Sequence, residues 1–202
     1  MKRWAQRLSC AAVLICLFCF GCSPRIAHLD SKGKTVICFG DSITEGLGAG
    51  PGEDYPSVLS GMIGRPVINA GVSGDTTAEA LSRIEGDVLA RDPRLVIVIL
   101  GANDFFRKVP KAETFANMEK IVSRIQARGA AVAIGVVKIG LIGDVYTKEF
   151  KRIARERGAV FIPDVMKGIL SDPKLKHDQI HPNGAGYKLI AERVYKTVAP
   201  LL

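Results

Sequence analysis

The sequence predicts an α/β fold in which helices cover both faces of a parallel sheet of about five strands. Short apolar runs rich in β-branched residues alternate with segments whose apolar residues recur at helical spacing. Residues 95–100 are apolar without interruption, which is typical of a strand that is buried on both faces. Strands and helices that alternate in this way favour a single three-layer domain with flavodoxin-like strand order.

The elements can be assigned in chain order, with glycines marking many of their ends. Strands are expected at residues 35–39, 66–70, 94–100, 130–137 and 159–162. Helices are expected at residues 57–63, 76–91, around 115–125, 146–157 and 184–198. Gly40 and Gly71 end the first two strands, and Gly129 stops the third of these helices. The segment 46–56 is rich in glycine and proline and reads as a loop.

The N-terminus has the pattern of a signal peptide. Residues 1–7 are basic, and residues 8–21 are apolar and uncharged. Gly21-Cys22 resembles a bacterial lipoprotein processing site, although Cys19 stands where leucine is usual. We therefore expect a signal peptide at 1–21, a tether at 22–33 and one domain at 34–202, in an exported lipoprotein anchored through Cys22 on the periplasmic or extracellular side. Two alternatives are an uncleaved membrane anchor and an ordinary cysteine at position 22.

Cysteine usage and charge limit the partners. Of the five cysteines, only Cys38 lies in the predicted domain, so the domain cannot form an internal disulfide, and Cys38 is expected to be a small buried hydrophobe. The formal charge is +8, of which residues 22–202 carry +5. This modest excess suits an anionic membrane surface. No basic cluster interleaved with aromatics, zinc spacing or phosphate-binding glycine loop is present, so no nucleic acid, metal or cofactor is expected.

Ser42 follows the first strand directly, after Gly40-Asp41. A hydroxyl at this strand-to-helix turn is exposed at the carboxyl end of a parallel strand, where open α/β sheets bind ligands. The following helix would direct free N–H groups at the same place. The alternative is that Ser42 only caps that helix, since serine is a preferred N-cap residue.

Four blocks in order resemble the SGNH (GDSL) hydrolase family, and the resemblance covers roughly residues 34–200. The blocks are Gly40-Asp41-Ser42-Ile43-Thr44-Glu45-Gly46, Asn69-Ala70-Gly71-Val72-Ser73-Gly74-Asp75, Gly101-Ala102-Asn103-Asp104 and Asp178-Gln179-Ile180-His181-Pro182-Asn183. The resemblance implies a carboxylic ester hydrolase with Ser42 as nucleophile. It also implies an oxyanion hole formed by the backbone N–H groups of Ser42 and Gly71 and the side-chain amide of Asn103.

The residue types suit acyl transfer, which needs a nucleophile, a base, a group that orients the base and donors for the oxyanion. His181 can take the proton from Ser42, and Asp178, three residues earlier, can fix the tautomer of its ring. His28 lies in the tether, and His177 has Lys174 three residues before it, so neither fits this role. Asp41 is expected to support the turn without taking part in the chemistry.

The substrate is expected to be a small-molecule ester, because apolar residues follow two of the strands that carry the site. Phe105 and Phe106 and the loop 137–143 could border an acyl group or pack against the sheet. The chain most resembles the bacterial arylesterase and thioesterase/lysophospholipase branch, whose Pro-Pro-Asn element after the fourth strand is missing here. The alternatives are a carbohydrate O-acetyl esterase and a non-catalytic lipid- or glycan-binding lipoprotein.

Overall fold

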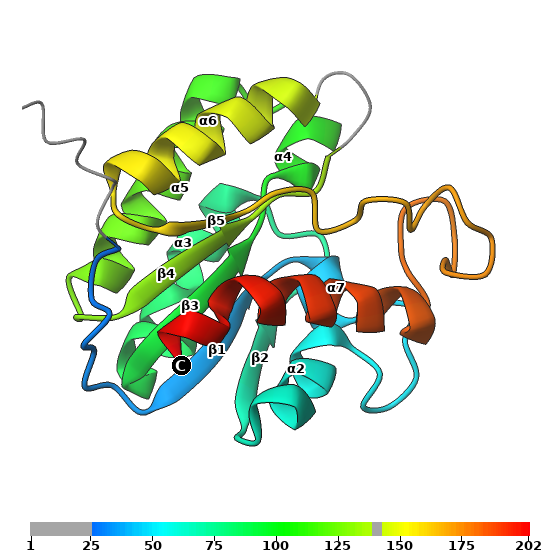
Figure 1. The fold of residues 1–202 in the computed structure, drawn as a ribbon. Coiled ribbons are helices and arrows are strands. Elements are labelled where there is room, and N and C mark those ends of the chain that lie inside the picture. The colour runs from blue at the N-terminus through cyan, green and yellow to red at the C-terminus, as the bar shows by residue number, and fades with distance from the viewer. Residues whose placement is uncertain (1–25, 139–142) are drawn as a thin grey trace, which may run out of the picture.

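A computed structural model describes residues 26–138 and 143–202, which form one α/β/α domain (Figure 1). The sheet has five parallel strands, β1 (Thr35–Gly40), β2 (Val67–Gly71), β3 (Pro93–Ile99), β4 (Ala131–Gly135) and β5 (Val160–Ile162). Their order in the sheet is β2-β1-β3-β4-β5. This order confirms the predicted flavodoxin-like connectivity, in which the strand order reverses beside β1.

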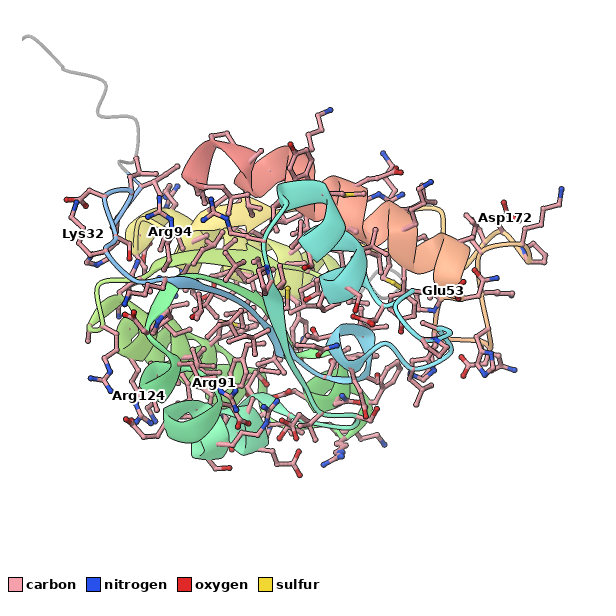
Figure 2. All side chains as sticks on the ribbon, turned by 90° about the horizontal axis from the view of Figure 1, so that it is seen from below. Lys32, Glu53, Arg91, Arg94, Arg124 and Asp172 are labelled. Atoms are coloured by element: carbon pink, nitrogen blue, oxygen red, sulfur yellow. The ribbon has the colours of Figure 1, made fainter. Side chains whose placement is uncertain are left out.

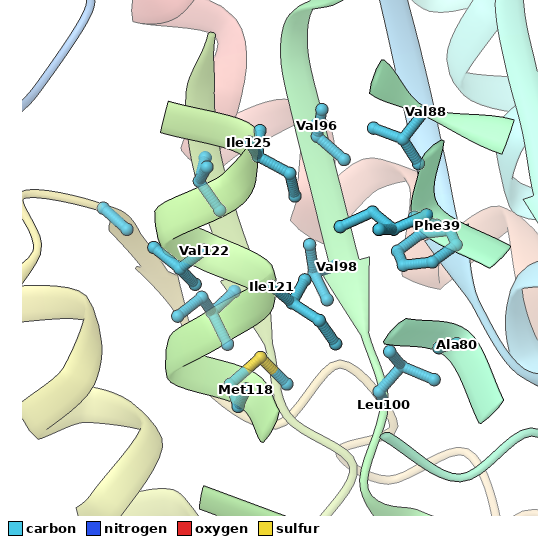
Figure 3. Packing of buried hydrophobic residues seen from close by; sticks show 14 of the residues in the cluster. Phe39, Ala80, Val88, Val96, Val98, Leu100, Met118, Ile121, Val122 and Ile125 are labelled. Atoms are coloured by element: carbon cyan, nitrogen blue, oxygen red, sulfur yellow. The ribbon is translucent and has the colours of Figure 1, made fainter. Parts of the chain in front are cut away.

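Helices cover both faces of the sheet, and each face has its own hydrophobic cluster. On one face lie α3 (Thr77–Asp87), α5 (Lys111–Gln126) and α6 (Gly143–Glu156); α2 (Tyr55–Ile63) and α7 (Gly184–Val198) cover the other. Neighbouring strand residues point to opposite faces. Phe39 and Val98 therefore pack under α3 and α5 (Figure 3), whereas Cys38 and Ile97 pack under α2 and α7.

Cys38 is fully buried, which confirms the expectation that it is a small hydrophobe. Burial raises the pKa of its thiol to about 12, so the sulfur stays protonated and unreactive.

Short elements account for most differences from the prediction. The helices α1 (Ser42–Glu45) and α4 (Ala102–Phe106) are a single turn each. The first is the helix expected to follow the turn at Ser42, whereas α4 was not predicted, because five residues cannot display a hydrophobic period. The helix expected at 76–91 is divided at Val88 into α3 and the 3₁₀ turn η1 (Leu89–Arg91). A second 3₁₀ turn, η2 (Ala199–Leu201), follows α7.

The described part of the expected tether packs against the domain. Ala27 donates its N–H to the carbonyl of Gly158 at 2.8 Å, and Arg94 donates to the carbonyl of Ser31 at 2.8 Å. A Cβ added at Gly33 would lie 2.1 Å from the carbonyl oxygen of Pro93. The expected signal peptide and Cys22 lie outside the described residues. Within the described ranges, no helix is long and apolar enough to cross a membrane.

Candidate active site

Ser42 begins the one-turn helix α1 at the carboxyl end of β1. Gly40 is the residue that fits there, because a Cβ would lie 2.2 Å from Thr44 Oγ1 and 2.4 Å from the carbonyl oxygen of Ile99. Asp41, not Ser42, is the N-cap of the helix, and its Oδ1 accepts from the N–H of Ile43 at 3.0 Å. The alternative that Ser42 serves as the cap is therefore wrong, and its hydroxyl is free to face the cavity.

Ser42, His181 and Asp178 form a hydrogen-bonded chain across 139 residues of sequence. His181 Nε2 lies 3.1 Å from Ser42 Oγ, and His181 Nδ1 lies 2.8 Å from Asp178 Oδ2. Asp178 Oδ1 also accepts from the N–H groups of Ile180 and His181, both at 2.8 Å. The bond to His181 and then the N–H of Ile180 lower the pKa of the Asp178 carboxyl to about 2. Asp178 is therefore an anion wherever the imidazole can act as a base.

The segment that carries this pair is fixed at its junction with α7. Asn183 is the N-cap of α7: its Oδ1 accepts from the N–H of Gly186 at 3.1 Å, and its Nδ2 donates to the carbonyl of Lys174 at 2.9 Å. From within α7, Tyr187 donates its hydroxyl to the carbonyl of Leu47 at 2.8 Å. These contacts join the histidine segment to the loop that follows Ser42, so Ser42 and His181 are held from both sides.

The structure corrects the expectation for Gly71. Its N–H donates to Asn69 Oδ1 at 3.0 Å, and Gly71 does not line the cavity that contains Ser42. Gly74, three residues later, does line it. The N–H groups of Gly74 and Ser42 have no hydrogen-bond partner within the described ranges. The positive φ of Gly74, 87°, is a conformation that favours glycine, and the second glycine of the same sequence block was the signal that could have identified it.

Asn103 lies beside these donors, at the start of α4. Its side-chain amide donates to the carbonyl of Asp75 at 3.0 Å and lies 3.5 Å from Asp41 Oδ2. Asn103 also lines the cavity. The amide that was predicted to stabilise an oxyanion is thus held against the loop that presents Gly74.

Three buried carboxylates support the floor of the site. Asp41 is 1% exposed, and burial raises the pKa of its carboxyl to about 7. Asp104 is fully buried and accepts from both the N–H and the hydroxyl of Thr77, at 2.9 and 2.5 Å. Asp75 accepts from Arg83 Nε at 2.6 Å. The sequence assigned no role to Asp75 or Asp104: the partner of Asp104 is 27 residues away in sequence, and the partner of Asp75 is eight residues away on α3.

Arg83 of α3 connects the ends of two strands. Its guanidinium donates to the carbonyls of Gly40 at 3.0 Å and Ala70 at 3.1 Å, besides its bond to Asp75. It also lies 4.6 Å from the ring centroid of Phe39, a cation–π contact. The turns that carry Ser42 and Gly74 are therefore tied to one side chain.

A cavity of about 560 Å³ opens beside Ser42 and His181. Its wall is mainly apolar and includes Phe106, as the sequence suggested, whereas Phe105 packs against the core. Of the expected apolar loop at 137–143, Val137 and Lys138 line the cavity, and residues 139–142 lie outside the described residues. The remaining apolar lining residues are Ile43, Leu47, Ala102, Leu170 and Ile180. Among the described residues, no group of three or more His, Cys, Asp or Glu could hold a metal ion.

A serine, a histidine and an aspartate bonded in series, beside backbone N–H groups that have no partner in the described ranges, form the arrangement found in serine hydrolases. Residues 38–189 match the GDSL-like lipase/acylhydrolase family, and the chain belongs to it. It is 28% identical to the esterase TesA of Pseudomonas aeruginosa over 86% of this chain and 92% of that protein. It is 25% identical to the thioesterase 1/protease 1/lysophospholipase L1 of Escherichia coli K12, over 85% of this chain and 86% of that protein. A crystal structure of TesA superposes with a TM-score of 0.79 at 26% identity, covering 84% of this chain and all of that one.

Proposed function

We propose that the protein hydrolyses carboxylic esters through an acyl intermediate on Ser42. His181 Nε2 removes the proton from Ser42 Oγ as the oxygen attacks the ester carbonyl, and it returns that proton to the leaving alcohol. The same imidazole then activates the water that attacks the acyl-serine. The single observation that carries the proposal is the continuous chain from Ser42 Oγ through His181 to Asp178, at 3.1 and 2.8 Å.

The oxyanion is proposed to be stabilised by the N–H groups of Ser42 and Gly74 together with the amide of Asn103. All three residues line the same cavity, and the two backbone donors have no other partner within the described ranges. Such fixed donors act on the charge that develops as the tetrahedral intermediate forms. Gly74 replaces Gly71, whose N–H is already bonded to Asn69.

The acyl part of the substrate is proposed to be apolar and longer than acetyl. Leu47, Phe106 and Ile180 line the cavity and are exposed to solvent by 39%, 48% and 46%. Covering these side chains with an alkyl chain would contribute roughly 25 cal/mol per Å² of apolar area removed from water. The apolar wall therefore supports an acyl ester, thioester or lysophospholipid-type substrate over a carbohydrate O-acetyl ester.

The experiment is to measure kcat/KM of the purified protein on p-nitrophenyl esters from acetate to palmitate. We expect turnover that rises from acetate to a medium chain and is lost in Ser42→Ala, together with a fluorophosphonate adduct on Ser42. A maximum at acetate would favour the O-acetyl esterase. Full activity of Ser42→Ala, or an adduct on another serine, would exclude Ser42 as the nucleophile. No turnover and no adduct would favour a binding protein.

Membrane attachment is a separate proposal, because the residues on which it rests lie outside the described residues. It is supported by the basic residues 1–7, the apolar residues 8–21 and Gly21-Cys22. Cys22 is proposed to become the lipid-modified N-terminus of an exported protein. The intact mass of the membrane fraction should lack residues 1–21 and include a lipid. An unmodified chain that begins at Met1 would contradict lipidation and favour an uncleaved anchor.

A further inference from the structure

The two ends of the parallel sheet differ in charge. Segments that precede the strands lie at the amino end of the sheet, and those that follow them lie at the carboxyl end, where the cavity opens. The connecting segments at the amino end, residues 26–34, 64–66, 88–92, 127–130 and 157–159, are called the basic end here. They contain two exposed acidic residues, Asp30 and Asp92, and six exposed basic ones: Lys32, Lys34, Arg65, Arg91, Arg128 and Arg157.

The carboxyl end is less basic by the same count. Its connecting segments in the described ranges, within residues 41–54, 72–76, 100–110, 136–138 and 163–183, contain five exposed basic residues and three exposed acidic ones: Arg107, Lys108, Lys138, Lys167 and Lys174 against Glu45, Glu53 and Asp178. Figure 2 shows Lys32, Arg94 and Arg124 toward one end of the molecule and Glu53 and Asp172 at the other. Exposed cations therefore exceed exposed carboxylates by four at the basic end (six against two) and by two at the carboxyl end (five against three).

Most cations of the basic end are not neutralised within the protein. Arg128 pairs with Glu85 at 3.4 Å and Arg157 with Glu119 at 3.2 Å. Among the described residues, the other four have no carboxylate partner: Lys32, Lys34, Arg65 and Arg91. The field of these four charges is therefore available to an external anion.

The chain enters the described domain at this same end. Ala27 is bonded to Gly158, immediately before β5, and Leu29 beside it is 47% exposed. Residues 22–25 can span at most about 14 Å when fully extended, so a membrane attachment at or before residue 22 would keep the basic end close to the lipid. This holds for a lipid on Cys22 and equally for an uncleaved apolar segment.

We propose that the basic end lies on an anionic lipid surface. Lys32, Lys34, Arg65 and Arg91 meet the headgroups, and the Leu29 side chain enters the interface. Juxtamembrane basic residues are attracted to anionic lipids in this way, and the attraction decays over a Debye length. The length of the sheet then separates the cavity from the bilayer, so the ester reaches Ser42 from the side facing away from the membrane that holds the enzyme.

The test is flotation of residues 26–202 with vesicles. This part contains every described strand and helix and both hydrophobic clusters, so it is a complete folding unit. We expect it to float with phosphatidylglycerol/phosphatidylcholine vesicles in 50 mM salt and to be released by 500 mM salt. It should not bind vesicles of pure phosphatidylcholine. The triple variant Lys32→Glu, Arg65→Glu and Arg91→Glu should lower the partition coefficient at least about a hundredfold.

The matched control is Lys108→Glu, Lys167→Glu and Lys174→Glu, which changes the net charge equally at the carboxyl end. All three lysines are exposed. The control should bind vesicles within about threefold of the wild type, because these charges face away from the lipid. An equal loss of vesicle binding in both triple variants would show that binding depends on net charge alone, and it would overturn the proposal. Absence of binding to anionic vesicles would also overturn it, and retention on polyglutamate alone would assign the surface to a soluble polyanion.

A second measurement tests the orientation in the full chain. The protein is reconstituted in anionic vesicles and labelled on Ser42 with a fluorophosphonate dye. The distance of the dye from the bilayer is then followed by energy transfer to acceptor lipids. Transfer should be lower in the wild type than in the basic-end variant, while the activity of that variant on a soluble ester stays unchanged. Transfer in the wild type equal to or above that in the variant would overturn the orientation. Failure to label Ser42 would count against the nucleophile and leave the flotation result to decide the membrane surface.

Discussion

Asp178→Asn tests whether the carboxylate orients the base or only shapes its turn. The asparagine Oδ1 can still accept from the N–H groups of Ile180 and His181, which Asp178 Oδ1 accepts now at 2.8 Å. The amide that replaces Oδ2 would present an N–H toward His181 Nδ1. The imidazole would then carry its proton on Nε2, 3.1 Å from Ser42 Oγ, and could not accept the serine proton.

The expected loss is on the order of 10⁴ in kcat, with an unfolding midpoint close to that of the wild type. The stability effect stays small because the Asp178 side chain is 43% exposed and its turn is preserved. Asp172→Asn is the matched control: Asp172 accepts from the N–H of Lys174 at 2.9 Å in the same kind of turn but has no histidine partner. The assay is kcat/KM on p-nitrophenyl butyrate beside thermal melting. Activity of Asp178→Asn within threefold of the Asp172→Asn control would refute the reasoning.

Three further changes test the rest of the site. Asn103→Ala should lower kcat by roughly 10²–10³ with little change in KM, because the amide acts on the developing charge; unchanged kcat would remove it from the oxyanion hole. Gly71→Ala should lower the free energy of unfolding by about 3 kcal/mol, because its Cβ would lie 2.1 Å from the backbone nitrogen of Glu45; an unaltered melting curve would contradict this packing. Asp41 is predicted to destabilise the fold as pH rises, since burial raises the pKa of its carboxyl in the folded protein from the usual 3.8 to about 7. The stability that the protonated Asp41 contributes is present below pH ~4 and lost by pH ~7. Between these two pH values, the free energy of unfolding of Asp41→Asn, measured with urea, should therefore rise by about 4 kcal/mol relative to that of the wild type. A difference that stays constant with pH would show that Asp41 is ionised in the fold.

The fold was largely predictable because strong periodic patterns specify it. Residues 95–100 read as a doubly buried strand, and β3 lies at the centre of the sheet with Leu95 to Ile99 unexposed. The spacing of Met118, Val122 and Ile125 predicted α5 in the same way. The one-turn helix α4 escaped prediction because five residues cannot display a helical period, whereas α1 was expected from the strand-to-helix turn at Ser42.

The site was predictable in its residue types and less so in its geometry. The sequence identified Ser42, Asp178 and His181 as candidates, and the structure places His181 within hydrogen-bond distance of both Ser42 and Asp178. Between Gly71 and Gly74 the sequence could not decide, because both glycines stand in one block. The choice depends on a tertiary contact, the bond from the N–H of Gly71 to Asn69, together with the left-handed φ of Gly74.

The guanidinium of Arg83 has a consequence for how this enzyme could diversify. It donates to the carbonyls of Gly40 and Ala70, which begin the turns to Ser42 and Gly74, so the proposed nucleophile and one proposed oxyanion donor share a single support. The apolar wall belongs to other segments, with Phe106 on α4 and Ile180 in the segment before α7. Mutations in that wall can therefore change which acyl group is accepted while the reacting groups keep their mutual positions, and this separation is what allows substrate range to evolve without rebuilding the catalytic apparatus.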